Sequence, residues 1–177
     1  AAENMVRGGA WMFLDLGRRI ERAQATAANL GHALSEPPSR LEAGLRLGLE
    51  LCDSLLTYRA RYLGVVQPAP VLDLVLADPG NPRALGYQLA AVAARLAEIG
   101  EPEDQLAANA AVLAARPQEL VQWVVQARDR DAAAAALPDA LHALADEIGT
   151  LSDSVARRHV SHVRPRALGE DEAGAAE

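Results

Sequence analysis

The densest group of charged residues lies in residues 15–22, inside a segment whose apolar residues recur at helical spacing. At roughly 100° per residue, we place Asp15, Arg18 and Arg22 opposite the apolar side of that helix. Arg19 and Glu21 then lie on its two flanks, where they cannot touch each other. Each flanking residue is therefore expected to meet a different neighbouring helix.

Two interpretations of this charged cluster follow from its residue types. In the first, which we favour because such patterns are common on bundle helices, it is a solvated face with Asp15 next to Arg19, and its flanking residues bridge to other helices. In the second, the arginines line a surface for a carboxylate, a phosphate or a partner protein. The planar guanidinium group suits these ligands better than an ammonium group does.

Metal and nucleophile sites find little support in the sequence. Asp139-x-x-His142 and His159-x-x-His162 have ligand spacing on a helix. A di-metal centre in a bundle, however, needs two carboxylate-histidine motifs and two further carboxylates. We therefore expect no metal and no other cofactor. The one cysteine, Cys52, lies in an apolar stripe and is predicted to be a buried, unreactive thiol.

The composition excludes several classes of chemistry. All 17 basic residues are arginine, so the chain lacks the lysine that Schiff-base catalysis, Walker-type phosphate binding and ATP-binding ligases require. The net charge of −7 argues against nucleic-acid binding, which needs a basic surface. Half of the residues are apolar, and the abundance of alanine and leucine favours an all-helical protein.

Hydropathy gives no sign of a membrane-spanning segment or a signal peptide. No run of about 18 apolar residues is free of charged ones. We therefore expect a soluble, cytoplasmic protein without a membrane partner, and a single cysteine fits a reducing compartment. Because the sequence does not begin with methionine, we interpret the chain as a piece of a longer protein.

Hydrophobic periodicity predicts an all-α bundle of about six helices with short connections, in which the first and last helices span much of its length. A short run at residues 71–76 could suit a strand, but a single strand would leave its backbone groups unpaired, so we predict a helix. We expect one domain, residues 1–166, and a disordered acidic tail, residues 167–177. The predicted helices are residues 3–34, 39–62, 71–76, 82–99, 103–127 and 138–164.

Capping residues and prolines set the predicted helix boundaries. Ser39 with Glu42 is predicted to form a capping box. Asn81 is predicted to cap a helix that has Pro82 at its first position. Two further prolines are expected at boundaries, one starting or kinking a segment and one opening the last helix: Pro117 and Pro138.

A further pattern is carried by Glu3–Gly8, Trp11–Ala23, Leu55–Tyr62, Leu72–Leu85, Leu151–Ser154 and the pair Arg157-Arg158. In this order, across residues 3–163, these segments resemble the Alpha-E domain, a family named for its helices and its Glu-Arg pair. Any one segment alone is a weak signal, and together they are fairly specific. By this resemblance, Glu21 and Arg22 take the positions of the named pair.

The resemblance implies that the chain is the second of two related halves of the domain, because it has one Glu-Arg helix. The form that it most resembles follows a circularly permuted ATP-grasp module, and relatives are associated with transglutaminase-like and proteasome-like proteins. The implied role is an accessory domain in an ATP-dependent amide-forming or peptide-modifying system. The ligase chemistry would lie elsewhere.

The resemblance also covers polar residues outside the first helix, namely Arg59, Arg61, Asp78, Asn81 and Arg83. Arg59 and Arg61 are expected to pack with Tyr58 at a helix end rather than face an anion. Ala84 stands where serine is common, which argues against a hydroxyl function there.

Two hypotheses compete with an accessory role in which the domain holds or orients an ATP-grasp ligase partner. A ligase-associated pocket would use Glu21, Asp153 and nearby arginines to bind an anionic substrate or nucleotide. A half-domain could instead leave an apolar face uncovered, which predicts a homo-oligomer of the isolated chain. The accessory role predicts no catalysis by this chain alone and leaves open an ATP-dependent ligase activity of the full-length protein.

Overall fold

The chain folds as an all-α protein, as predicted. The computed structural model describes residues 9–35, 37–100 and 104–159, and within them it contains seven α-helices and no strand. A 3-10 turn, Pro38–Arg40, precedes α2, and a π-helical turn, Asp73–Ala77, follows α4. The helices are α1 (Gly9–Leu34), α2 (Leu41–Leu51), α3 (Leu55–Tyr62), α4 (Pro68–Leu72), α5 (Leu85–Ile99), α6 (Gln105–Gln126) and α7 (Arg130–His159).

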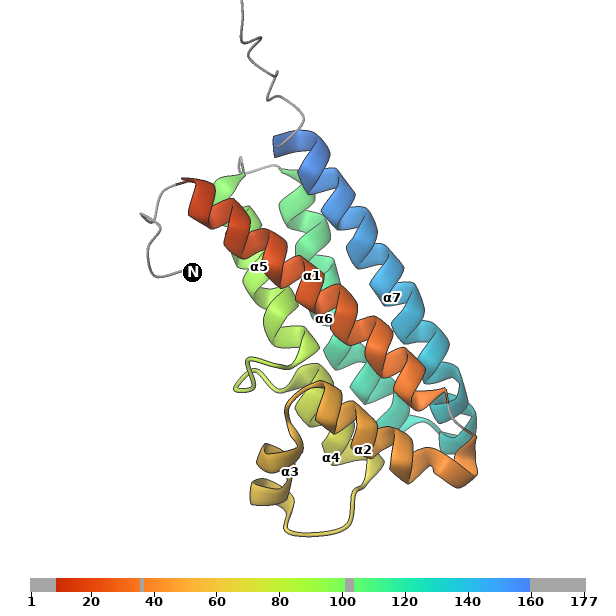
Figure 1. Ribbon diagram of the computed structural model, residues 1–177. Helices are drawn as coiled ribbons and strands as arrows, with labels where there is room; N and C mark the ends of the chain where they lie inside the picture. Colours follow the sequence, from red (N-terminus) through yellow and green to blue (C-terminus); the bar gives the residue numbers. More distant parts are fainter. Residues whose placement is uncertain (1–8, 36, 101–103, 160–177) are drawn as a thin grey trace, which may run out of the picture.

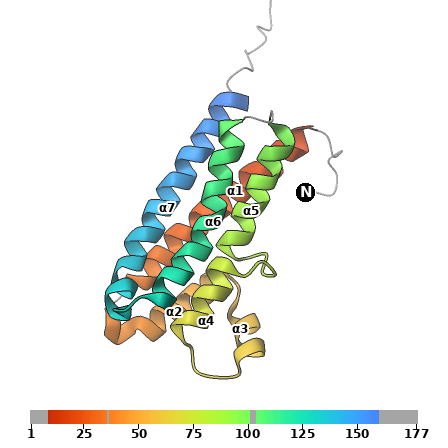
Figure 2. The ribbon, with the colours of Figure 1, turned by 180° about the vertical axis from the view of Figure 1, so that it is seen from behind.

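Four long helices, α1, α5, α6 and α7, form a bundle, and the shorter α2, α3 and α4 lie at one end of it (Figure 1). α1 packs against α7, α5 and α2, whereas α6 packs against α5 and α7. Seen from behind, α5 and α6 lie side by side in front of α1 (Figure 2). The first and last helices, with 26 and 30 residues, span much of the bundle, which confirms that prediction.

The buried side of α1 is the apolar side that helical spacing predicts for this segment. Its residues recur at spacings of three and four, so they form one face of the helix. This face packs against three other helices at once, which fixes the rotation of α1 about its own axis. The buried residues of the stripe are Leu16, Ile20, Ala23, Ala27, Leu30 and Leu34.

Two glycines let α2 approach α1 closely after the turn that joins them. A Cβ atom on Gly44 would lie 2.3 Å from the backbone oxygen of Ala33, in the last turn of α1. A Cβ atom on Gly48 would lie 3.1 Å from a methyl carbon of Leu30. Because the nearest atom to Gly44 belongs to the backbone, a side chain there requires the two helices to move apart.

The predicted second helix is divided in two. α2 ends at Leu51, and Asp53 adopts a left-handed conformation with φ of 45°. Aspartate tolerates this conformation better than most residues do. The amide of Ser54 then donates a hydrogen bond to the carbonyl of Leu49, 2.8 Å away, and α3 begins. The predicted helical character of residues 71–76 is confirmed, because α4 and the π-helical turn cover them.

The capping box predicted at Ser39 and Glu42 is wrong. Ser39 lies within the 3-10 turn, and the residue before α2 is Arg40, whose side chain makes no capping hydrogen bond. A capping residue has an extended backbone, whereas the residues before α2 form the 3-10 turn Pro38–Arg40. The predicted helical residues 3–8 and 160–164 and the predicted tail, residues 167–177, lie outside the described residues.

Pro138 does not open the last helix, and Pro117 does not start a new one. Pro117 lies inside α6, and Pro138 lies inside α7, which begins eight residues earlier at Arg130. The alternative that Pro117 kinks its helix stays a prediction. Both prolines are buried, so packing offsets the loss of one helical hydrogen bond at each. Aspartates, not prolines, precede these two helices and cap them. Asp104, before α6, accepts a hydrogen bond from the amide of Leu106, and Asp129, before α7, accepts one from the amide of Ala132.

Candidate functional site

Half of the charged cluster of α1 ties that helix to α5. The carboxylate of Asp15 lies 2.9 Å from Nε of Arg19 and 3.6 Å from Nε of Arg95, which comes from α5. Nη1 of Arg19 donates a hydrogen bond of 3.4 Å to the side-chain oxygen of Gln88, and Gln88 donates in turn to the carbonyl of Pro82. The predicted pairing of Asp15 with Arg19 is confirmed, and so is the contact of Arg19 with a neighbouring helix.

The other half of the cluster faces outward. Arg18, Glu21 and Arg22 are exposed, and among the described residues none of them has a hydrogen-bond or ion-pair partner. The prediction that Glu21 meets a neighbouring helix is therefore wrong. Glu21 lies five residues after the buried Leu16, which rotates it by about 140° from the centre of the buried stripe rather than onto its flank.

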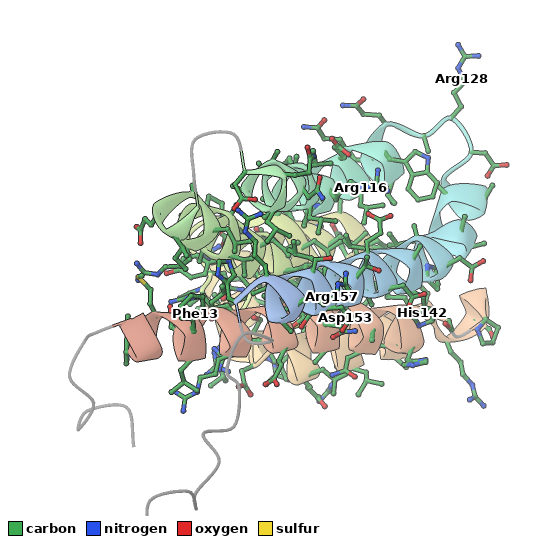
Figure 3. The ribbon with its side chains drawn as sticks, turned by 90° about the horizontal axis from the view of Figure 1, so that it is seen from above. Phe13, Arg116, Arg128, His142, Asp153 and Arg157 are labelled. Atoms are coloured by element: carbon green, nitrogen blue, oxygen red, sulfur yellow. The ribbon has the colours of Figure 1, made fainter. Side chains whose placement is uncertain are left out.

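We call the exposed residues Arg18, Glu21, Arg22, Ala25 and Asn29 the outer face of α1. Viewed from above, α1 runs along one edge of the bundle beside α7, and its outward side chains point away from the other helices (Figure 3). The packed side of α1 is held by α7, α5 and α2. The outer face is thus a rigid, mixed-charge surface.

A second polar cluster surrounds Asn81, which is only 7% exposed. Its amide nitrogen donates hydrogen bonds to Oγ of Ser54, 3.0 Å away, and to the carbonyl oxygen of Leu74, 2.9 Å away. Its side-chain oxygen accepts a hydrogen bond from the amide of Arg83. Asn81 therefore joins the start of α3, the π-helical turn and the loop before α5.

This arrangement corrects the prediction that Asn81 caps a helix with Pro82 at its first position. α5 begins at Leu85, and the preceding Ala84 makes no side-chain capping bond. The carbonyl of Leu74 lies in the π-helical turn, whose altered hydrogen-bonding leaves acceptors for a side chain. Because Asn81 satisfies this buried acceptor, its main role is tertiary rather than local.

Two ion pairs flank the Asn81 cluster. Arg61 pairs with Asp78, and Arg83 pairs with Asp53. The hydrogen bond from Arg61 lowers the pKa of Asp78, and the amide of Gly80 acts in the same direction. Three of the predicted polar residues, Arg61, Asp78 and Arg83, are thus brought together at the end of the bundle that holds α3.

The remaining predicted residues lie apart from both clusters. Arg59 is exposed on α3, and Asp153 is exposed on α7, where Figure 3 shows it near Arg157. Tyr58 is buried, as expected for packing at a helix end, and its hydroxyl donates to the carbonyl of Val65 and accepts from the amide of Gln67. The expectation that Arg61 packs with Tyr58 rather than faces an anion is wrong, because Arg61 is exposed and pairs with the carboxylate of Asp78. The ligase-associated pocket stays a prediction.

Grooves in the described part of the chain are lined by other residues than those of the predicted pocket. One of about 490 Å³ lies between α5 and α6, with Tyr87 and Gln118 among its polar lining residues. A second, about 310 Å³, lies between α6 and α7 over Leu113 and Leu151. A third, about 400 Å³, is lined by residues that include Gln67 and Val124.

The surroundings of the cysteine and of His142 favour packing roles over catalysis or metal binding. Burial, and to a smaller extent the Asp53 carboxylate, raises the pKa of Cys52 to about 12, so its thiolate is scarce near neutral pH. His142 belongs to α7, and the centroid of its ring lies 4.6 Å from the ring centroid of His32 on α1. In the described part of the chain, no three His, Cys, Asp or Glu side chains are arranged to hold a metal ion.

Four residues of these clusters and of the ion pairs beside them were missed by reasoning from the sequence: Arg95, Gln88, Ser54 and Asp53. Gln88 interrupts an apolar stripe of α5 that contains Leu85 and Leu89, and a polar residue in such a place is a usable signal for a buried hydrogen bond. Ser54 and Arg95 carry no such signal, because serine at a helix start and arginine on a helix are both common.

The described residues define an all-helical domain whose Glu-Arg helix presents its charged pair to the surface. The chain belongs to the Alpha-E family, described as a predicted α-helical domain with a conserved ER motif, and residues 1–160 match the family. The predicted membership is therefore confirmed. Among the described residues, no helix has the length and apolar character required to cross a membrane.

The comparison with curated proteins finds relatives in mycobacteria. Uncharacterized proteins of Mycobacterium bovis and of two strains of Mycobacterium tuberculosis are each 38% identical to this chain over 101 residues. The match covers 56% of this chain and 11% of each relative, so the chain corresponds to a small part of their length. No solved structure matches the chain.

Proposed function

We propose that the chain is a non-catalytic interaction domain that binds a partner protein through the outer face of α1. The observation that carries this proposal is the position of the Glu-Arg pair. The family is described by a conserved ER motif, and the resemblance places Glu21 and Arg22 at its positions. Both residues are exposed, so packing of this chain does not account for their retention. Retained polar residues at a surface point to recognition.

The chemistry of the outer face suits a partner that offers both signs of charge. Arg18 and Arg22 are one helical turn apart, and their guanidinium groups can each hold a carboxylate or phosphate with two parallel hydrogen bonds. Glu21 lies beside them and accepts hydrogen bonds from a cationic group. A surface of mixed sign selects against partners whose charges are misplaced.

The anchoring of α1 supports the same role. Asp15, Arg19 and Arg95 hold one flank of the helix to α5, so the outer face is fixed before a partner arrives. A preorganised surface loses less conformational entropy on binding than a mobile one. The charged cluster of α1 is thus divided between anchoring residues and recognition residues.

The partner that we propose is an ATP-grasp ligase module, in the same polypeptide or in trans. The resemblance to Alpha-E domains that follow such a module supports this choice. The small share of each mycobacterial relative that the match covers also fits a domain embedded in a much longer protein. The domain would hold or orient the module within an amide-forming or peptide-modifying system.

Isothermal titration of the purified ATP-grasp module with this chain tests the proposal. We expect Arg22→Ala to weaken binding by about tenfold or more, since arginines at interface centres dominate binding energy. The matched control is Arg128→Ala, which removes an exposed arginine from the α6–α7 connection, distant from α1 in Figure 3. Equal affinity of wild type and Arg22→Ala, or no binding by the wild type, would contradict the proposal.

A further inference from the structure

The end of the bundle that holds α3 presents apolar side chains to solvent. Leu56 is 78% exposed, Leu63 is 94% exposed and Val65 is 72% exposed. Leu56 and Leu63 are seven residues apart, and Arg59 and Ala60 lie between them at the helical spacings of three and four, all of them exposed. We call Leu56, Arg59, Ala60 and Leu63 the α3 stripe. This spacing is the one by which helices engage a partner helix or groove.

Buried polar contacts hold the α3 stripe in place. The hydroxyl of Tyr58, on the inner side of α3, bonds to the carbonyl of Val65 at 3.3 Å and to the amide of Gln67 at 3.0 Å. These two bonds fix the segment after α3 against the helix. The Asn81–Ser54 hydrogen bond fixes its start. The exposed leucines are therefore presented at defined positions.

Leu63 combines exposure with an unfavourable backbone conformation. It ends α3 with φ of 31° and ψ of 12°, in the left-handed region that favours glycine. Neither feature benefits the folded chain alone: the side chain gains no burial, and glycine, which has no Cβ atom, would relieve the backbone. Such outliers cluster at sites of binding and catalysis. The position of Leu63 is explained if a partner covers its side chain.

The charge around the α3 stripe indicates the kind of partner. Residues 54–72 contain two arginines and no acidic residue, although the whole chain has a net charge of −7. Arg61 pairs with Asp78, whereas Arg59 is exposed within the stripe and has no ion-pair partner among the described residues. An apolar surface with an unpaired cation complements an apolar surface edged by carboxylates.

From these observations we propose that the α3 stripe is a second docking surface, distinct from the outer face of α1, and that it binds an acidic amphipathic helix of a partner protein. The apolar residues of that helix cover Leu56 and Leu63, and its carboxylates meet Arg59. A lipid surface fits less well, because membrane attraction grows with the number of basic residues and this surface offers one unpaired arginine.

Two fluorescein-labelled synthetic helices test the proposal by fluorescence anisotropy with the full chain. Both have leucines at spacings of three and four, with glutamate at the other positions in one and lysine in the other. We expect the glutamate peptide to bind and the lysine peptide to bind at least about tenfold more weakly. Leu63→Ser should weaken binding of the glutamate peptide by about tenfold. Arg59→Glu should reverse the preference between the peptides.

Val112→Ser, which changes an exposed apolar residue of α6, is the matched control and should leave binding unchanged. Equal binding of both peptides, or binding that survives both Leu56→Ser and Leu63→Ser, would overturn the proposal. So would dimerisation that Leu63→Ser abolishes, since a second copy would then cover the stripe. Leu63-dependent sedimentation with phosphatidylcholine–phosphatidylserine vesicles, without peptide binding, would assign the stripe to a membrane instead.

The two docking surfaces can be tested independently. Arg22→Ala should leave binding of the glutamate peptide unchanged, and Leu63→Ser should leave binding of the ATP-grasp module unchanged. If Leu63→Ser abolished binding of the module, one surface would serve both interactions, and the inference of a second docking surface would fail.

Discussion

Replacing Gly44 with alanine is expected to destabilise the protein by about 2 kcal/mol or more, because the added carbon meets the backbone of another helix. The new Cβ atom would lie 2.3 Å from the carbonyl oxygen of Ala33. Alanine also favours a helix over glycine by about 1 kcal/mol, but this gain is smaller than the cost of separating α1 from α2. Urea unfolding followed by circular dichroism measures the difference.

Gly17 supplies a matched control with the opposite expected sign. It lies on the exposed side of α1, and a Cβ atom there would meet nothing within 4 Å. Gly17→Ala should therefore stabilise the protein by about 0.5–1 kcal/mol. If Gly44→Ala also stabilised the protein, the close packing of α2 on α1 would be wrong.

Asn81→Ala should lower the free energy of unfolding by about 2–4 kcal/mol, because it leaves several buried groups without partners. The amide of Asn81 bonds to Oγ of Ser54 and to the carbonyl of Leu74, and its oxygen accepts from the amide of Arg83. Loss of a helix cap alone would cost only about 1 kcal/mol. The size of the loss measured by urea unfolding thus distinguishes the two roles.

Two further variants sharpen the test of Asn81. Asn81→Asp keeps an acceptor for the Arg83 amide but loses both donors, and it should be nearly as destabilising as alanine. Asn109→Ala, which removes an exposed bond to Gln105 on α6, should change stability by less than about 0.5 kcal/mol. A small loss in Asn81→Ala together with none in Asn81→Asp would show that Asn81 acts only locally.

The fold class could be predicted from the sequence because long helices carry periodic apolar residues. The stripe of α1 and the end of α5 at Gly100 follow from spacing and from glycine, and both are present. Periodicity is read within one segment, so it does not depend on knowing the partners of that segment. Membership of the Alpha-E family rests likewise on local segments in a fixed order.

Boundaries that depend on packing could not be predicted. Pro117 and Pro138 are strong local signals against a continuing helix, yet both lie within helices because burial offsets the missing hydrogen bond. The role of Asn81 could not be predicted either. Its partner Ser54 is distant in the sequence, and its other partner, Leu74, lies in a π-helical turn. Such contacts appear only once the helices are assembled.

The charged cluster of α1 contains both contacts that could be predicted from the sequence and contacts that could not. Pairing of Asp15 with Arg19 follows from helical spacing, but the contribution of Arg95 requires α5 to be in place. Glu21, in contrast, does not need the other helices to be placed. It lies five residues after Leu16 in the predicted apolar stripe, so helical geometry alone puts it about 140° from the centre of that stripe, and its predicted place on a flank is an error of angle.

The free energy of unfolding of the double variant Glu21→Gln/Arg22→Ala tests the central claim most directly, because recognition residues and bridging residues predict different values. We expect the double variant to differ from the wild type by less than about 0.5 kcal/mol in urea unfolding, as exposed residues without partners usually do. A loss of about 2 kcal/mol or more would show that the pair holds helices together. That result would contradict its assignment as a recognition surface.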